Sequence, residues 1–202
     1  TEKARAFPRY SQLAQNIYSS SGERLPNVSR DMTYKVTARS ISQDGWGTNN
    51  TTDSGVGIKV VSSGMGNFRV TGPADANLVW EPGQVYPIDW TIGNTLNAPD
   101  SILAGTVNIY LSLDGGLSFP IILATNVPNT GNFGITSPNY MTSSARVKVK
   151  GVGNVFFDVS KVNFKVNGTL GIKGQNITST INVFPNPAEQ MITVTNKAFD
   201  GK

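Results

Sequence analysis

Cysteine and histidine are both absent from the 202 residues of this chain. Without cysteine there are no disulfides and no thiolate nucleophiles, and without histidine there are no Ser-His-Asp triads and almost no zinc sites. The thirteen acidic residues are scattered, and no two of them are spaced as an acid/base pair. We therefore expect a non-catalytic chain that holds no cofactor of its own.

Long apolar runs and strong charge clusters are missing as well. No apolar stretch approaches the roughly 20 residues that a spanning helix needs, so we expect no membrane span. The net charge is only +4, and the basic residues are not clustered with stacking aromatics, so we expect no nucleic-acid partner. The first residue is not Met and no signal peptide is recognisable, which we interpret as a piece of a longer protein.

Turn-forming residues are abundant, with 21 glycines, 11 prolines and many serines, threonines and asparagines. This composition predicts an all-β protein. A helical pattern is present only near the start, where apolar residues recur from Tyr10 to Tyr18 and predict a helix of about ten residues. Residues 31–40 alternate like a strand. We interpret residues 1–65 as a partial β-rich domain, either the end of a larger domain or a cap on its neighbour.

Residues 66–167 contain short alternating segments separated by turn clusters. Strands of about 4–8 residues at this spacing are typical of an immunoglobulin- or fibronectin-like β-sandwich. Trp80 and Trp90 are the predicted core anchors, and Pro87, which lies within a strand, is expected at an edge or a bulge. The composition of residues 168–180 predicts a linker after the sandwich.

The run SLDGGLSF resembles the Asp-box, a hairpin motif of sialidase propellers and sandwich domains. Its signature positions are Ser112, Asp114, Gly116, Ser118 and Phe119. Asp114 can accept hydrogen bonds from its own turn, the glycines permit positive φ, and Phe119 can close the hairpin base. We interpret the run as a structural turn, with calcium or sugar binding as the alternative.

Basic residues alternate with apolar ones in two later segments. The polar positions are Arg146, Lys148, Lys150, Lys161, Asn163 and Lys165. If the two strands are neighbours, five cations share one face, which we interpret as a solvated face that keeps the sheet soluble. The alternative is attraction of an acidic glycan or lipopolysaccharide.

Other positions are candidates for ligands or modification. Aromatic side chains that could contact sugar rings are Trp46, Tyr110 and Tyr140. The loop with Asp44 and Asp53 offers oxygen ligands for a structural calcium, but no EF-hand spacing is present and we favour a polar loop. Ser101, in the run Asp-Ser-Ile, resembles the O-glycosylation signal of Bacteroidetes.

Residues 181–202 contain the run VFPNPAEQMITV. Its two prolines fix φ and remove N–H donors, so a rigid corner separates two short apolar strands, and the asparagine can cap it. The run resembles the start of the type A C-terminal sorting domain of the Bacteroidetes type IX secretion system. The matching positions are Phe184, Pro185, Asn186, Pro187 and the strand 191–194. The resemblance implies a truncated sorting domain whose partner is the type IX secretion machinery.

Most of the remaining chain, from about Leu25 to Val166, resembles the region behind the catalytic domain of secreted reprolysin-like zinc metallopeptidases of Bacteroidetes. The matching runs are RLPNVSRDMTYKVTARS, NFRVTGP, VYPIDWTIGNT, VNIYLSLDGGLSFPIILATNVPNTG and ARVKVKGVGNVFFDVSKVNFKV. Where the family usually has RDN, this chain has Arg39-Ser40-Ile41. The family's His-Glu-x-x-His zinc helix is not in this chain. The resemblance therefore implies zinc only in a catalytic domain elsewhere in the parent protein.

These observations predict a non-catalytic spacer or docking region with a secretion-sorting signal. The parent would be a multidomain bacterial metalloendopeptidase that is secreted or anchored at the outer membrane. The expected partners are the secretion machinery and the catalytic domain of the parent. Two alternatives stay open: a glycan-binding or adhesin sandwich, and a parent enzyme of another class such as a glycosidase.

Overall fold

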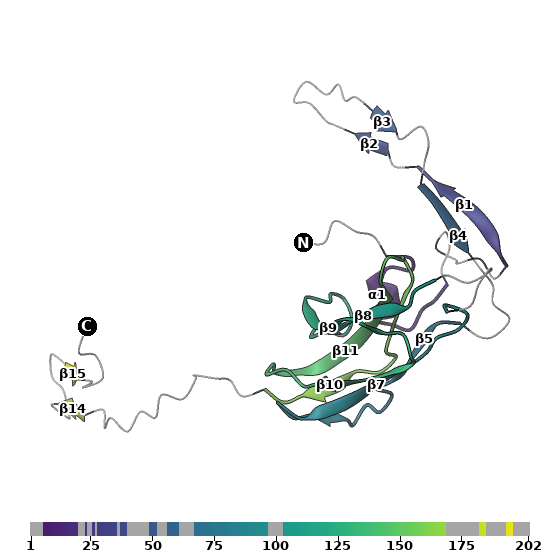
Figure 1. The fold of residues 1–202 in the computed structure, drawn as a ribbon. Coiled ribbons are helices and arrows are strands. Elements are labelled where there is room, and N and C mark those ends of the chain that lie inside the picture. The colour runs from purple at the N-terminus through teal and green to yellow at the C-terminus, as the bar shows by residue number, and fades with distance from the viewer. Residues whose placement is uncertain are drawn as a thin grey trace, which may run out of the picture. The chain divides into compact units, whose positions relative to one another are not determined.

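The computed structural model describes most of the chain from residue 6 to residue 168 and two short strands near the end. The described residues are 6–19, 23, 26, 28–35, 37–39, 49–51, 56–60, 67–96, 103–168, 182–184 and 193–195. The chain divides into two compact units, Thr1–Thr169 and Leu170–Lys202. The predicted all-β class is confirmed, because strands dominate the described residues and the helix among them has four residues (Figure 1).

The described residues of the first unit form a short helix followed by thirteen strands. These elements are α1 (Tyr10–Leu13), β1 (Arg30–Tyr34), β2 (Thr37–Arg39), β3 (Asn49–Thr51), β4 (Val56–Val60), β5 (Arg69–Gly72), β6 (Val79–Trp80), β7 (Val85–Thr91), β8 (Thr106–Ser112), β9 (Ile121–Pro128), β10 (Asn132–Thr136), β11 (Thr142–Gly151), β12 (Phe157–Val159) and β13 (Phe164–Val166). Two antiparallel pairs precede the larger sheets, β1 with β4 and β2 with β3.

The helix is shorter than the sequence pattern predicts. It ends because Asn16 adopts the left-handed conformation, with φ of 58°. The N–H of Ile17 then donates to the carbonyl of Gln12 and the N–H of Asn16 donates to that of Leu13, both at 2.9 Å, which is the hydrogen-bond pattern of a Schellman motif. The apolar stripe is divided accordingly: Leu13 is buried, whereas Ile17 is exposed.

Strands β5 to β13 form two sheets. The smaller sheet has the order β10-β7-β5, and the larger has the order β6-β13-β11-β8-β9, with β12 also paired to β11. All pairings within them are antiparallel except that of β13 with β6. Arg146, Lys148 and Lys150 thus lie on β11, and Lys165 lies on its neighbour β13, whereas Lys161 and Asn163 come just before β13.

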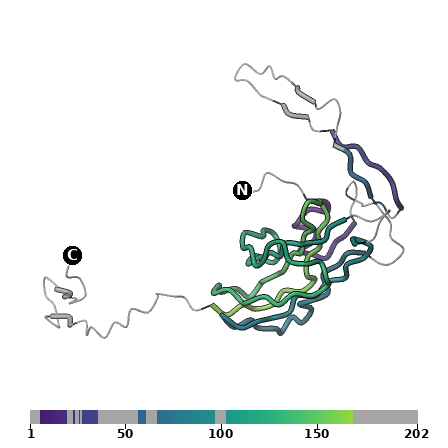
Figure 2. The backbone as a smooth tube through the Cα atoms, in the orientation of Figure 1, coloured from purple at the N-terminus to yellow at the C-terminus, as the bar shows by residue number. Residues whose placement is uncertain are grey.

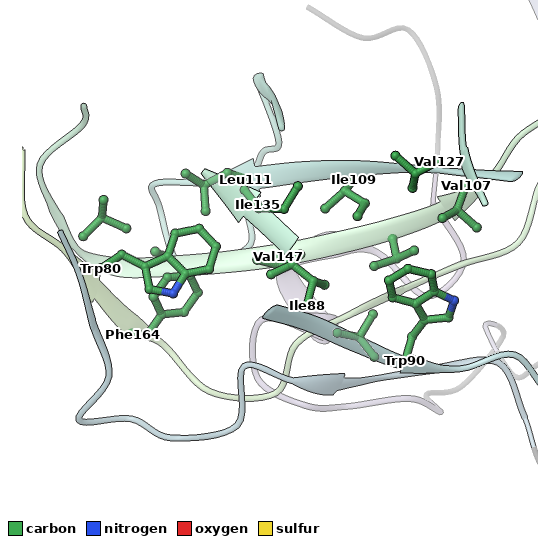
Figure 3. Close-up of a cluster of buried hydrophobic side chains, with 14 residues drawn as sticks. Trp80, Ile88, Trp90, Val107, Ile109, Leu111, Val127, Ile135, Val147 and Phe164 are labelled. Carbon is green, nitrogen blue, oxygen red and sulfur yellow. The ribbon is translucent and has the colours of Figure 1, made fainter. Parts of the chain in front are cut away.

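Both sheets contribute side chains to one hydrophobic core (Figure 3). Strand β8 shows the alternation best: Val107, Ile109 and Leu111 are fully buried, and the residues between them are only partly covered. The other members of this core are Val70, Trp80, Ile88, Trp90, Val127, Ile135, Ala145, Val147, Val149, Phe164 and Val166. Burial of each large side chain stabilises the fold by about 1.5–3 kcal/mol.

The prediction of Trp80 and Trp90 as core anchors is confirmed. Trp80 has no exposed surface and stacks on Tyr86 with ring centres 5.2 Å apart. Trp90 donates its indole N–H to the side-chain oxygen of Asn129 at 2.7 Å. The amide nitrogen of Asn129 donates in turn to Thr95 Oγ1 and to the carbonyl of Ala104. One buried asparagine therefore ties together β7, the turn after it and the approach to β8.

Pro87 lies in the middle strand of the smaller sheet, yet it has a paired strand on one side only. The pairing of β5 with β7 covers residues 89–91 of β7 and includes a register shift. It stops before Pro87, which has a partner only on β10, at Gly134. A residue without an N–H donor is tolerated at such a position.

The second unit contains two described strands, β14 (Asn182–Phe184) and β15 (Thr193–Thr195), which pair antiparallel. Phe184 is opposite Thr193 and Val183 is opposite Val194. Pro185, Asn186 and Pro187 come directly after β14 but lie outside the described residues. In the part of the chain that the structure describes, there is no helix of the length and apolarity that crossing a bilayer requires.

Replacement of Asn129 by alanine tests the buried network. Asn129→Ala leaves the indole N–H of Trp90 without its acceptor in a site that excludes water, and we expect a loss of about 2–3 kcal/mol in the free energy of unfolding. Urea denaturation followed by tryptophan fluorescence measures it. The matched control is Asn67→Ala at an exposed asparagine, which should change stability by less than about 0.5 kcal/mol. Equal effects of the two changes would contradict the proposed role of the network.

Candidate functional site

A group of polar and aromatic side chains lies where the N-terminal segment meets the larger sheet. We call residues 6–19 the strap. We call the side chains beneath it the acceptor face, which consists of Tyr110, Phe119, Arg146, Lys148 and Phe157. In Figure 2 the purple trace of the strap runs beside the green trace of the sheet.

Lys148 is the centre of the acceptor face. It is only 3% exposed, and it lies directly opposite Tyr110 across the β8–β11 pairing. Its ammonium nitrogen is 4.7 Å from the ring centre of Tyr110 and 4.6 Å from that of Phe119. The ring of Phe157 on β12 is 6.0 Å away. Rings at these distances attract a cation through their quadrupoles and partly replace its lost hydration.

The strap supplies the fourth ring through Tyr10. The ring centre of Tyr10 is 5.0 Å from the ammonium of Lys148, and its hydroxyl accepts a hydrogen bond from that ammonium at 3.0 Å. The same ring packs against Phe119 at 5.3 Å and Phe157 at 5.7 Å. Tyr10 therefore contacts three members of the acceptor face at once.

Arg146 holds the helical turn of the strap. Its Nη1 donates to the carbonyl of Leu13 at 3.2 Å, and its Nε donates to Oδ1 of Asn163 at 2.6 Å. Arg146 is only 5% exposed, and this burial lowers the pKa of its guanidinium, although the interaction with Tyr18 opposes the shift. A buried guanidinium has to use its donors, and here a strap carbonyl satisfies one of them.

The end of the strap reaches a buried carboxylate near β5. The guanidinium carbon of Arg69 lies 5.6 Å from the ring centre of Tyr18. Burial raises the pKa of the Tyr18 hydroxyl, and the charge of Asp158 raises it further. Asp158 accepts the backbone N–H of Val70 at 2.8 Å, so it links β12 of the larger sheet to β5 of the smaller one.

The surroundings of Asp158 disfavour the ionised form of its carboxyl group. Burial is the largest effect and raises the pKa of Asp158 above its ordinary value. The backbone N–H groups of Val70 and Val159 and the charges of Arg69 and Lys161 oppose the shift without cancelling it. Ionisation of this side chain therefore costs stability in the folded state.

At the start of the strap, an ion pair connects Arg9 to Glu23. Nε of Arg9 donates to one carboxylate oxygen at 2.9 Å, and the backbone N–H of Arg9 donates to the other at 3.2 Å. The carboxylate is almost fully buried, whereas the guanidinium side chain is 62% exposed. Solvent screens such a pair, so it positions the strap more than it stabilises it.

The prediction of a solvated basic face is wrong for two of its members. Arg146 and Lys148 are buried, Lys150 is half-buried, and only Lys161, Asn163 and Lys165 are exposed. The reason is that the strap and the three surrounding rings cover this part of the face. Alternation shows which residues point away from the core, but it does not show what packs over them.

The run Ser112 to Phe119, which we call the Asp114 turn, satisfies its own polar groups. Oδ1 of Asp114 accepts the backbone N–H groups of Leu117 at 3.1 Å and Ser118 at 2.9 Å. Ser112 Oγ donates to the same oxygen and accepts the N–H of Gly116 at 2.8 Å. These are the bonds that a structural turn requires.

The conformation of the Asp114 turn places it against residues of the acceptor face. Gly115 and Gly116 have φ of 75° and 95°, and a Cβ on Gly116 would lie 3.1 Å from Cδ of Arg146. Phe119, at the end of the turn, points to Lys148 and Tyr10. The turn therefore positions one of the four rings around the ammonium.

Hydrogen bonds control the charge of Asp114. Burial is the largest single effect and acts to raise its pKa, but the bonds from Ser112, Ser118 and Leu117 together outweigh it and lower the pKa. The carboxylate form is thus favoured in the folded chain, which is the opposite of the situation at Asp158.

The other predicted site residues do not gather at one place. Tyr110 is half-buried in the acceptor face, and Tyr140, which is exposed, lies in the loop between β10 and β11. Phe184 ends β14. The positions that lie outside the described residues are Asp44, Trp46, Asp53, Ser101, Pro185, Asn186 and Pro187. No group of three acidic, histidine or cysteine side chains that could hold a metal is found among the residues that are described.

Comparison with models of known protein families and with curated proteins gives no match. The candidate site therefore rests on its geometry, namely buried cations, aromatic rings and a docked segment. These groups can bind and orient a polypeptide through cation–π contacts and hydrogen bonds.

The raised pKa of Asp158 predicts an unusual pH dependence. A folded-state pKa above the unfolded one means that the folded chain binds more protons, so this group makes stability fall as pH rises above about 4 through the folded pKa. Asp158→Asn can still accept the N–H of Val70 but does not titrate. We expect the stability of the variant relative to wild type to increase between pH 4 and pH 7, measured by urea denaturation at each pH.

Asp114→Asn is the matched control, because the pKa of Asp114 is shifted in the opposite direction from that of Asp158. The lowered pKa of Asp114 contributes stability that is present above the unfolded value and is lost as pH falls through the folded value. The stability of this variant relative to wild type should therefore improve as pH falls below about 4. A pH-independent difference for both variants would contradict the assignment of the two environments.

Proposed function

We propose that this chain is a non-catalytic accessory region whose two-sheet module docks the polypeptide that precedes it. The observation that carries the proposal is the strap. Tyr10 and Leu13 of the strap are held by Lys148 and Arg146 of the sheet. A polypeptide joined to the strap would enter the module through a bound segment and not through a free linker, so its position relative to the module would be restricted.

The module is best interpreted as an immunoglobulin-like β-sandwich. Two sheets with mostly antiparallel pairing share one core, and buried tryptophans on β6 and β7 lie in it. Sandwiches of this kind are often used as rigid supports, because their function resides in loops and faces that the core holds in place.

The parent protein is proposed to be a secreted bacterial zinc metallopeptidase. The support is the resemblance of the runs from Leu25 to Val166 to the region behind the catalytic domain in that family. Zinc and its ligands would belong to the catalytic domain of the parent, which is the proposed partner of the module. The strap precedes the module in sequence, as a connection to such a domain must.

The last residues are proposed to be a sorting signal for type IX secretion. The motif Phe184-Pro185-Asn186-Pro187 supports this, and so does the antiparallel pairing of β14 with β15 on either side of the corner in sequence. A hairpin of this kind could present a rigid corner to the export machinery at the outer membrane.

Deletion of everything from Ile181 onward in the parent protein tests the sorting role. In a Bacteroidetes host with type IX secretion, we expect the shortened protein to accumulate in the periplasm and the intact one to reach the medium or the cell surface. Immunoblots of the cell fractions measure this. A matched control removes the linker residues 168–180 instead and should leave export intact. Normal export of the protein that lacks everything from Ile181 onward would refute the sorting role.

A further inference from the structure

Recognition of the strap depends on a few specific contacts. Tyr10 makes a hydrogen bond and a cation–π contact with Lys148, and its ring packs on Phe119 and Phe157. Three residues later, Leu13 buries its side chain and presents its carbonyl to Arg146. One helical turn brings both residues to the same surface, because positions i and i+3 lie on one side of a helix.

The acceptor face has supports of its own that do not involve the strap. The internal hydrogen bonds of the Asp114 turn fix the backbone just before Phe119. Asn163 orients the guanidinium of Arg146, and Asn108 donates to the hydroxyl of Tyr110 at 3.3 Å. Backbone pairing of β8, β11 and β12 holds the remaining positions. A preorganised face loses little conformational freedom when a ligand binds.

We propose that the acceptor face is a binding site for a Tyr-x-x-Leu helical turn and recognises residues 6–19 as a ligand. In the structure the ligand is supplied by the same chain. The same segment from a second copy, or as a free peptide, is expected to bind in its place. This inference rests on the proposed docking role of the module, and it is independent of the proposed sorting signal.

The tethered strap is the competitor of any free copy. A segment that belongs to the same chain as its site binds it intramolecularly, so it acts as if it were present at a high effective concentration. A free peptide should therefore bind wild type weakly and should bind much better to a chain whose own strap has lost its anchors.

The probe is a synthetic peptide of residues 6–19, AFPRYSQLAQNIYS, with a fluorescent label. The acceptor is the full chain with Tyr10→Ser and Leu13→Ser, which removes both anchoring side chains of its own strap. Fluorescence anisotropy should show saturable binding to this opened chain and binding at least about tenfold weaker to wild type. Near-UV circular dichroism of the buried tryptophans verifies that the opened chain is folded.

Two matched controls establish where the peptide binds. A peptide with Tyr10→Ser should bind the opened chain at least about tenfold more weakly, because it lacks the ring and hydroxyl that contact Lys148. The opened chain with the additional change Phe119→Ala should lose affinity for the unchanged peptide to a similar extent. The exposed change Lys165→Ala, on the neighbouring strand, should not alter affinity.

Absence of saturable binding to a folded opened chain would overturn the proposal, as would equal affinities for the opened chain and wild type. Hydrogen exchange of wild type gives a second measurement that needs no opened chain. Excess free peptide should accelerate exchange of the strap amides at residues 12–17, because it displaces the strap, and unchanged exchange would count against the site. Either failure leaves the secretion experiment unaffected, so the two proposals can fail separately.

Discussion

The ammonium of Lys148 is buried, and the organisation of this side of the sheet depends on how that charge is stabilised. Removal of a charge from water costs several kcal/mol unless other groups replace the water. Here Tyr110 from β8, Phe119 from the Asp114 turn and Phe157 from β12 provide three rings. Tyr10 of the strap provides the fourth ring and a hydroxyl acceptor. The strap therefore helps to stabilise the charge through direct contacts, in addition to shielding it from water.

The Asp114 turn connects a local motif to this distant contact. The hydrogen bonds of its side chains lie within residues 112–118, and the N–H of Gly115 joins the turn to β11 by donating to the carbonyl of Ser144 at 2.8 Å. Their consequence is not local, because the geometry of the turn places Phe119 against Tyr10 and brings Gly116 close to the side chain of Arg146. Glycine adopts the positive φ there without strain and avoids a close contact between a Cβ and the side chain of Arg146. A turn that its own side chains stabilise can thus also position residues of a docking surface.

The parts of the structure that follow local rules could be predicted from the sequence. Period-two alternation and turn residues identify the all-β class, and large aromatic residues on alternating positions identify Trp80 and Trp90 as core anchors. The length of the helix could not be predicted from apolar spacing, since Asn16 adopts a left-handed conformation and ends it. The burial of Arg146 and Lys148 could not be predicted either. The strap residues that help to cover them, Leu13 and Tyr10, are separated from them by 133 and 138 residues in sequence.

That separation bears on when the strap docks. Contacts between residues far apart in sequence form after the loop between them has been restricted, so the two-sheet module is expected to fold before the strap binds to it. The acceptor face is then complete before the strap, which supplies Tyr10, binds to it. An element that is added last to a finished surface through one buried turn can also be released without unfolding that surface. The strap is therefore separable from the module, because none of the core side chains between the two sheets belongs to residues 6–19.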